Sequence, residues 1–326
     1  MSKAIVINQT GGPEVLRWVE YDPGPPGPGE IRLRHEAVGL NFIDVYHRTG
    51  LYPLPSLPAV PGMEGSGTVE AVGEGVTEVA AGDRVAYAGL PPGAYAQVRR
   101  IPADRLVKLP ESITTQKAAA MMLQGMTARY LLRGCFGVKA GDTILIHAAA
   151  GGVGTIVCQW AKHLGATVIG TVGSEEKADN ATENGCDYPI RYTKEDFVER
   201  VREITEGRGV DVVYDSVGQA TFMKSLDCLR PLGTMVSFGQ SSGPVAPLEL
   251  GLLSAKGSLF LTRPTLMTYT AKREDLLTHV RDLFEVVEKG VVRVEIRQTF
   301  PLSDAARAHR DLEGRRTTGS SILLPE

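Results

Sequence analysis

The sequence has few cysteines, and they are far apart. Cys135, Cys158, Cys186 and Cys228 are the four cysteines in 326 residues, and no two of them form a C-x-x-C pair. Small secreted domains and zinc knuckles need closely spaced cysteines to hold the fold together. The spacing here excludes a disulfide framework and a structural zinc module, and it indicates buried, inert thiols.

Long apolar runs and clusters of basic residues are also missing. No segment approaches the roughly 18 apolar residues of a membrane span, and the N-terminal segment lacks the apolar run of a signal peptide. The net charge of -3 comes without a basic block, whereas nucleic-acid binding draws on clustered Lys and Arg. We therefore expect no membrane and no nucleic acid as partner, and a cytoplasmic location.

The composition is typical of a globular protein, and the pattern of apolar, Gly and Pro residues changes along the chain. With 326 residues, 43% of them hydrophobic, it is long enough for about two domains. Up to about residue 123, short strand-like segments broken by Gly and Pro predict an antiparallel β domain, with strands at 3–7, 30–38, 67–72, 84–87 and 95–101. From about residue 115, alternating helices and strands predict a parallel sheet with crossover helices, with strands at 143–148, 167–172, 210–214 and 233–238.

A glycine-rich turn joins the first strand of the second part to a helix. Residues 149–154 read A-A-G-G-V-G, and an amphipathic helical pattern follows over 155–164. Ala149 stands at the first glycine of the usual G-x-G-x-x-G, while Gly151 and Gly154 hold the other two. Small residues let the backbone approach phosphates, and the N–H groups of the helix meet their charge. The context predicts dinucleotide binding rather than an empty turn, at Ala150, Gly151, Gly152 and Val153.

Other strand ends carry small polar residues. The segments D-S-V-G at 215–218 and G-Q-S-S-G at 239–243 follow two strands of the predicted parallel sheet. Open α/β sheets bind ligands at the carboxyl ends of their strands, so we expect these loops to face the nicotinamide half of the cofactor. Beyond about residue 262 the pattern predicts a helix at 273–289, a strand at 293–300, a helix at 303–314 and an apolar end at 321–324. This tail is expected to return to the first domain.

The end of the second parallel strand bears on the choice of cofactor. NAD-preferring sheets place an acidic residue there to bind the adenosine ribose, but this chain reads T-V-G-S at 171–174, followed by two Glu residues and Lys177. Small residues and a cation admit a 2′-phosphate that an acid would repel. We predict NADPH over NADH, with Gly173, Ser174 and Lys177 near that phosphate. The alternative for Lys177 is a solvated residue at a helix start.

Several longer motifs resemble those of one family. The pattern A-x-x-G-x-x-G at 148–154, the N-terminal β domain and the returning tail resemble the medium-chain dehydrogenase/reductase superfamily. Within it, V-G-L-N-F-I-D at 38–44, V-P-G-M-E-G-S-G at 60–67 and V-V-Y-D-S-V-G at 212–218 resemble the zeta-crystallin-like quinone oxidoreductases. The similarity covers essentially the whole chain.

The resemblance implies an α/β fold with two domains. A GroES-like antiparallel β catalytic domain would occupy residues 1–124, and a Rossmann domain with a doubly wound parallel sheet would occupy residues 125–262. Residues 263–326 would return to the catalytic domain. The family also implies NADPH as cofactor and a homodimer whose contacts involve the Rossmann sheet.

The same resemblance implies a site without metal. Zinc-dependent relatives place a Cys where Asn41 stands, a His where Met63 stands and a second Cys near Leu123 or Gln124. An amide, a thioether and an aliphatic group do not supply the donor set of catalytic zinc, so we expect no metal. Without a Lewis acid an ordinary ketone is a poor substrate, whereas a quinone or a conjugated enal or enone accepts hydride readily.

The resemblance also implies which residues form the site. Asn41, Tyr46 and Tyr52 correspond to the active-site loop, and each can donate a hydrogen bond to a substrate oxygen. Ordinary packing is the alternative for the tyrosines, since Tyr46 follows Phe42 by four residues and Tyr52 lies in a turn-rich loop. The positions expected to contact the cofactor are Gln124, Thr127, Tyr192, Ser216, Phe238, Gln240, Ser241, Arg263, Thr317 and Gly319. For Arg263, a surface ion pair is the alternative.

The sequence therefore favours a zinc-independent oxidoreductase that transfers reducing equivalents from NADPH to quinones. An NADPH-dependent reductase of α,β-unsaturated aldehydes or ketones fits nearly as well. A non-catalytic NADPH-binding protein, either structural or RNA-binding, has little support because no basic stripe or aromatic stacking motif is present. A zinc-type alcohol dehydrogenase ranks last.

Overall fold

The computed structural model describes residues 1–326, and the chain divides into two compact units. The first unit contains residues 1–126, 270–281 and 294–326, and the second contains residues 127–269 and 282–293. The helices α3 (Met122–Tyr130) and α10 (Arg273–Glu288) contribute residues to both units. None of the helices has the length and apolar character that a bilayer-spanning segment needs.

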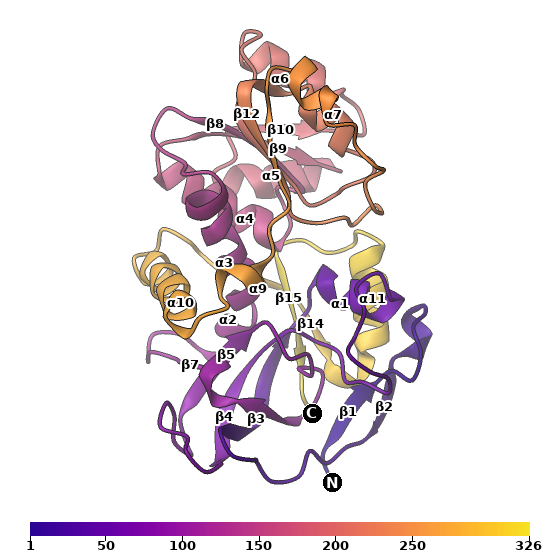
Figure 1. Ribbon diagram of the computed structural model, residues 1–326, viewed down its shortest axis with the longest axis vertical. Coiled ribbons are helices and arrows are strands. Elements are labelled where there is room, and N and C mark those ends of the chain that lie inside the picture. The colour runs from indigo at the N-terminus through magenta and orange to yellow at the C-terminus, as the bar shows by residue number, and fades with distance from the viewer. The chain divides into compact units, whose positions relative to one another are not determined.

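The first unit is built on a seven-stranded sheet that includes the end of the chain. Its strand order is β14-β15-β3-β4-β5-β7, and β6 also pairs with β3. β14 and β15 are parallel neighbours, as Figure 1 shows, and the other pairs are antiparallel. The strands are β3 (Glu30–Gly39), β4 (Glu64–Val72), β5 (Arg84–Ala88), β6 (Val98–Pro102), β7 (Val107–Lys108), β14 (Ile296–Pro301) and β15 (Ser320–Leu324).

The remaining elements of the first unit are short. β1 and β2 form a separate antiparallel pair. These elements are β1 (Lys3–Val6), β2 (Arg17–Glu20), η1 (Pro13–Val15), α1 (Phe42–Thr49), η2 (Ala103–Arg105), α2 (Thr115–Ala119), η4 (Leu302–Asp304) and α11 (Ala305–Glu313).

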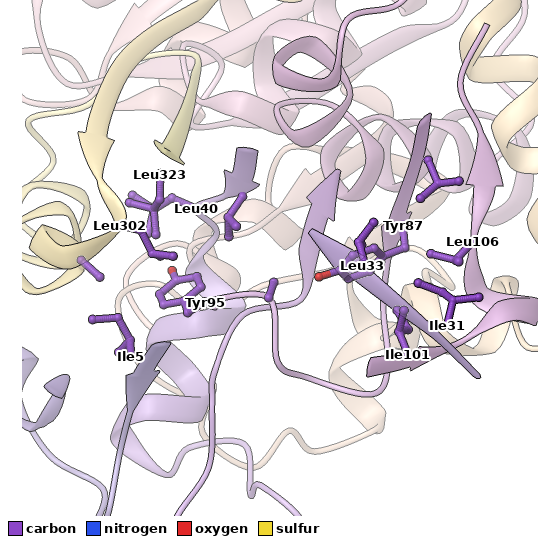
Figure 2. Packing of buried hydrophobic residues seen from close by; sticks show 14 of the residues in the cluster. Ile5, Ile31, Leu33, Leu40, Tyr87, Tyr95, Ile101, Leu106, Leu302 and Leu323 are labelled. Atoms are coloured by element: carbon purple, nitrogen blue, oxygen red, sulfur yellow. The ribbon is translucent and has the colours of Figure 1, made fainter. Parts of the chain in front are cut away.

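The core of the first unit joins residues from both ends of the sequence. β3 buries alternate side chains, such as Ile31 and Leu33, while Arg32 between them stays partly exposed. Figure 2 shows Ile31 and Leu33 in one cluster with Ile5, near the N-terminus, and Leu323, near the C-terminus. Full burial of each such side chain stabilises the fold by about 1.5–3 kcal/mol, so the last strand is part of the core of this unit.

The second unit is a parallel sheet of six strands in the order β10-β9-β8-β11-β12-β13. All five neighbouring pairs are parallel. The strands are β8 (Thr143–His147), β9 (Thr167–Val172), β10 (Tyr188–Arg191), β11 (Val210–Asp215), β12 (Leu229–Ser237) and β13 (Phe260–Thr262). The helical segments are η3 (Leu131–Cys135), α4 (Gly152–His163), α5 (Glu175–Glu183), α6 (Phe197–Ile204), α7 (Phe222–Leu226), α8 (Gly251–Ala255) and α9 (Leu266–Tyr269).

The predicted fold class is confirmed, with differences at the edges of the parallel sheet. β10 and β13 are not among the predicted strands. β10 has four residues, one of them Pro189, and β13 has three, so neither is long enough to show a strand pattern. Both are edge strands, where a proline or a short pairing costs little. Helix α4 begins at Gly152, inside the glycine-rich turn rather than after it.

Candidate active site

The predicted cofactor positions of the second unit lie at one edge of its sheet. Because all six strands are parallel, their carboxyl ends share this edge. The strand order reverses direction between β8 and β11, which is where open α/β sheets bind ligands. The predicted positions are Tyr192 after β10, Gly173, Ser174 and Lys177 after β9, Ala150, Gly151, Gly152 and Val153 after β8, Ser216 after β11, Phe238, Gln240 and Ser241 after β12, and Arg263 after β13.

The turn after β8 is tight, and its small residues explain why. Ala148 has a φ of 57°, and its carbonyl accepts a hydrogen bond from the Gly151 N–H at 2.9 Å. A Cβ at Gly154 would lie 2.3 Å from the Ala148 carbonyl oxygen and 2.7 Å from the Ala149 carbonyl carbon. Both contacts are with backbone, which has little freedom to move. Glycine at 154 therefore lets α4 begin directly against the end of β8.

The N-terminus of α4 is suited to bind a phosphate. Gly151 precedes the helix, and no side chain caps it. The first N–H groups of any α-helix lack partners within the helix, and the helix dipole adds positive potential there. At this helix, glycine residues leave the backbone approachable. The structure therefore fits the pyrophosphate of a dinucleotide at Gly151, Gly152 and Val153.

β9 itself ends without an acidic residue: Gly173 and Ser174 follow it, and Glu175 and Glu176 begin α5. Ser174 is exposed and its hydroxyl caps α5 by accepting from the Lys177 N–H at 3.3 Å. A Cβ at Gly173 would lie 2.9 Å from the Tyr192 hydroxyl, so the glycine leaves room for this ring. Glu175 forms an ion pair with Arg191. This ion pair offsets the negative charge of Glu175 near the predicted site of the 2′-phosphate.

The loops after β11 and β12 are tied to each other. The buried carboxylate of Asp215 accepts hydrogen bonds from the Val217 N–H at 2.7 Å and the Gly218 N–H at 3.0 Å, which shapes the first loop. The Ser241 N–H donates to the Ser216 carbonyl at 3.1 Å. At the end of β12, the Ser237 carbonyl accepts from Nη1 of Arg263 at 2.8 Å. Ser216, Gln240 and Ser241 thus belong to two loops in contact, and Arg263 is bonded to the end of the strand that precedes the second of them.

In the first unit, Asn41 stands immediately before α1. Its backbone N–H donates to Oδ2 of Asp44 at 2.9 Å, and Oδ2 also accepts from the Tyr95 hydroxyl at 3.1 Å. An acidic residue in the first turn of a helix pairs favourably with the free N–H groups there. The start of α1, and with it the position of Asn41, is therefore fixed by a buried carboxyl group.

The side-chain amide of Asn41 lies in a buried hydrogen-bond network. Nδ2 of Asn41 donates to Oε2 of Glu64 at 2.7 Å, and Oδ1 accepts from Nε2 of Gln124 at 3.1 Å. The Ser320 hydroxyl donates to Oε1 of Gln124 at 2.7 Å. The amide of Gln124 thus has both ends hydrogen-bonded within the first unit, while its contact with a cofactor stays a prediction.

Burial shifts the titration of both carboxyl groups around Asn41. Burial raises the pKa of Glu64 to about 8, against the opposing effect of hydrogen bonds from Asn41 and the Leu123 N–H. Burial likewise raises the pKa of Asp44 to about 7, although the donors Asn41 and Tyr95 oppose the shift. Two acidic groups with such perturbed pKa values behind one amide are typical of a functional site.

Tyr46 and Tyr52 follow Asn41 in the sequence, and their rings are in contact. Their ring centroids are 5.0 Å apart in an edge-to-face arrangement, and Phe42 lies 6.1 Å from Tyr46. The Tyr52 N–H donates to the Tyr46 carbonyl at 3.1 Å, which brings the loop after α1 back to the helix. Packing and a role in catalysis are compatible here, because the phenol hydroxyl can donate while the ring packs.

The other predicted positions are placed as follows. Thr127 is buried on α3, in the second unit. Thr317 and Gly319 precede β15 in the first unit, and Gly319 has a φ of 55°, which favours glycine. Their contacts with a cofactor remain predictions.

The residues at the zinc positions of the superfamily do not fit zinc. Asn41 uses its amide nitrogen as a donor to Glu64, and Met63 offers a buried thioether. No group of three or more His, Cys, Asp or Glu side chains is arranged to hold a metal ion. Catalytic zinc takes three ligands from Cys, His and carboxylates, so this donor set is inadequate.

Comparisons with known proteins agree with this architecture. Residues 27–111 match the family model of the alcohol dehydrogenase GroES-like domain, and residues 152–283 match that of a zinc-binding dehydrogenase. A quinone oxidoreductase of Pseudomonas aeruginosa is 53% identical over 325 residues, covering 100% of both chains. The crystal structure of an Escherichia coli quinone oxidoreductase complexed with NADPH has a TM-score of 0.97 at 50% identity, over 99% of this chain and 100% of that one. A 2-haloacrylate reductase of a Burkholderia species is 49% identical over 333 residues, covering 100% of both chains.

A GroES-like antiparallel domain combined with a Rossmann sheet defines a medium-chain dehydrogenase/reductase. Within this superfamily, the chain belongs to the quinone oxidoreductase family. The resemblance predicted from the sequence motifs is therefore confirmed.

Proposed function

We propose that this protein catalyses the reduction of quinones by NADPH. The observation that carries the proposal is its similarity, over the full length of the chain, to quinone oxidoreductases at 50 and 53% identity, one of them solved with NADPH. Bound NADPH supplies a hydride, and solvent supplies a proton, so that quinone, NADPH and one proton give hydroquinone and NADP⁺.

The cofactor-binding role is assigned to the carboxyl edge of the six-stranded sheet. The uncapped start of α4 would hold the pyrophosphate through backbone N–H groups. Ser174, Lys177 and Tyr192 would surround the 2′-phosphate, and the Arg191 guanidinium already neutralises Glu175 beside them. This arrangement supports NADPH rather than NADH.

The acceptor-binding role is assigned to Asn41, Tyr46 and Tyr52. Each can donate a hydrogen bond to an acceptor oxygen and so orient it, and each such bond contributes about 0.5–1.5 kcal/mol. The donor set at Asn41 and Met63 supports a reaction without zinc. Chelator treatment should therefore leave turnover unchanged, and stoichiometric zinc in the purified protein would contradict this assignment.

A second candidate function rests on one relative. The similarity to a 2-haloacrylate reductase supports reduction of a conjugated carbon–carbon double bond. Quinones and conjugated carbonyl compounds both accept hydride at an electron-poor centre, so one site can serve either class.

The test is the oxidation of NADPH by the purified protein with a panel of acceptors. The panel contains benzoquinone, naphthoquinones, enals, a 2-haloacrylate and simple ketones under matched conditions. We expect kcat/KM to be highest for a quinone and negligible for the ketones. Higher values for the haloacrylate or the enals would establish the second function instead. NADPH binding without turnover of any acceptor would indicate a non-catalytic role.

The cofactor preference is tested at Lys177. Loss of the charge in Lys177→Ala should raise KM for NADPH about tenfold and leave KM for NADH unchanged, because a charge-assisted hydrogen bond to phosphate is worth about 1.5 kcal/mol or more. Steady-state kinetics with both cofactors measure this. Lys194→Ala, in the loop after β10, provides a control for loss of a nearby positive charge. An unchanged KM for NADPH in Lys177→Ala would contradict the assignment.

A homodimer in the cytoplasm is the proposed setting. β13 is an edge strand, and Phe260 and Leu261 on it are 61% and 38% exposed. An open strand edge with exposed apolar side chains favours pairing with a second copy of the same chain. The four cysteines are free, as is usual in a reducing compartment.

A further inference from the structure

The amide of Asn41 has a defined polarity in the structure. Its nitrogen faces Oε2 of Glu64 at 2.7 Å, and its oxygen faces Nε2 of Gln124 at 3.1 Å. Glu64, Asn41 and Gln124 are all buried, so water does not compete for these contacts. Rotating the amide by half a turn would place oxygen against the carboxyl oxygen and nitrogen against nitrogen. Such mismatched buried contacts cost free energy at both ends.

The backbone fixes which way the chain of hydrogen bonds runs. The Leu123 N–H donates to Oε1 of Glu64 at 2.8 Å, and this donor cannot be reversed. Oε2 of the same carboxylate then accepts from Asn41, whose oxygen accepts from Gln124, whose oxygen accepts from the Ser320 hydroxyl at 2.7 Å. When Glu64 is ionised, the side-chain amides of Asn41 and Gln124 are therefore both oriented from the carboxylate outward.

The fold makes room for the carboxylate at this place. Glu64 is the first residue of β4, and a Cβ at Gly39, at the end of β3, would lie 2.2 Å from its Oε2. A glycine at the end of β3 thus leaves room for the fully buried carboxyl group of Glu64 to reach the side-chain amide of Asn41. Such an acid is costly to bury, and hydrogen bonding to Asn41 and Leu123 offsets part of that cost.

We propose that Glu64 is a positioning residue that fixes Asn41 as a hydrogen-bond donor toward a carbonyl oxygen of the acceptor. The inference rests on the proposed function and deepens it, because it specifies an acceptor that carries a carbonyl oxygen conjugated to the centre that is reduced. One N–H of Asn41 is used by Glu64, and the second N–H remains to bind the quinone or enone oxygen. Gln124 and Ser320 hold the same amide from its other side.

Replacing the carboxylate by its isosteric amide should reverse this polarity. In Glu64→Gln, the new oxygen can accept from the fixed Leu123 N–H, and the new amide nitrogen then faces Asn41. Asn41 must turn its oxygen toward that nitrogen, and Gln124 can follow by the same rotation. The shape of the core is kept, while the spare N–H of Asn41 moves to another place.

The experiment compares wild type, Glu64→Gln, Asn41→Ala and the double variant in NADPH oxidation by a naphthoquinone. Assays at pH 9 keep Glu64 ionised, since burial raises its pKa to about 8. We expect Glu64→Gln to lower kcat/KM for the quinone about tenfold, as for loss of one good hydrogen bond, and to leave the Kd for NADPH unchanged. Added to Asn41→Ala, it should cause no further loss, because both changes remove the same interaction. Glu70→Gln, on the same strand, is the matched control and should behave as wild type.

The inference would be overturned if Glu64→Gln had the same kcat/KM for the quinone as wild type. It would also be overturned if the double variant had a kcat/KM tenfold lower than that of Asn41→Ala. If Glu64→Gln does not fold, Ser320→Ala tests the other end of this series of hydrogen bonds. That variant should lower quinone kcat/KM about threefold at unchanged Kd for NADPH, and no change would count against the inference. If the wild-type protein turned over neither a quinone nor an enone with NADPH, the proposed function itself would be wrong. That outcome is seen in wild type alone, so it can be told apart from failure of the present inference, which shows only in the variants.

Discussion

Asp44 is a fully buried acid whose pKa is raised from 3.8 to about 7, mainly by burial. Between these values the folded chain keeps a proton that the unfolded chain has lost. The contribution to the free energy of unfolding is therefore fully present below pH 3.8 and is lost as the pH rises toward 7. Asp44→Asn lacks this titration. We expect its Tm relative to wild type to increase between pH 4 and pH 7, as measured by thermal denaturation.

Asp211 provides the comparison with the opposite sign. It accepts hydrogen bonds from Arg208 and Arg230, which hold its pKa down at about 2 against the effect of burial. Its stabilisation is present above pH 3.8 and is lost as the pH falls toward 2. Asp211→Asn should thus show a constant Tm deficit between pH 4 and pH 7. A Tm difference for Asp44→Asn that is equally constant would contradict the account of Asp44.

Single residues of the site were predictable only where a motif carried them. Asn41 could be selected from the motif at 38–44, and Tyr46 from the stretch that corresponds to the family's active-site loop, but the hydrogen-bond partners of Asn41 could not. Glu64 lies 23 residues from Asn41, and Ser320 lies 196 residues from Gln124, which it contacts. Those contacts depend on the register of β4 and β15 in the sheet, and a composition or a periodicity does not specify register between distant strands.

Among the elements, the junction of β8 and α4 gives a sharp prediction. A Cβ at Gly154 would meet the Ala148 oxygen at 2.3 Å, so Gly154→Ala must push the helix from the strand. We expect a loss of about 1–3 kcal/mol in the free energy of unfolding and weaker NADPH binding, measured by denaturant titration and by fluorescence. Gly251→Ala, at the start of α8, is the control, because nothing lies within 4 Å of the added atom. Unchanged stability in Gly154→Ala would contradict the packing argument.

The elements that could be predicted are those with a strong apolar pattern. β8, β9 and β11 are mostly buried, and β12 is buried mainly in its second half, where Met235 and Val236 lie; their apolar residues marked these four strands in the sequence. β10 and β13 are edge strands whose pairing comes from their neighbours, not from their own composition. The start of α4 within the glycine-rich turn also escaped prediction, since glycine has a low helix propensity and only the fold places it there.

At the scale of the whole molecule, the proposed homodimer is tested at β13. Phe260→Asp puts a charge on the open edge, so a β13-mediated dimer should dissociate into monomers. Size-exclusion chromatography with light scattering measures the mass. Met223 on α7 is 51% exposed, and Met223→Asp serves as the control that keeps the dimer mass. A dimer that persists in Phe260→Asp would place the interface elsewhere.

The two-unit organisation and the return of the tail to the first unit could be expected from the sequence, but the place of the last strand within the sheet could not. β15 lies between β14 and β3, and Leu323 belongs to the same core as Ile5. During synthesis on the ribosome, the nascent chain therefore lacks an inner strand of that sheet until residues 320–324 emerge. The six strands of the parallel sheet all lie within residues 143–262, so they are synthesised earlier. We therefore expect the parallel sheet to reach its native state before the seven-stranded sheet, although the sequence of the latter begins first.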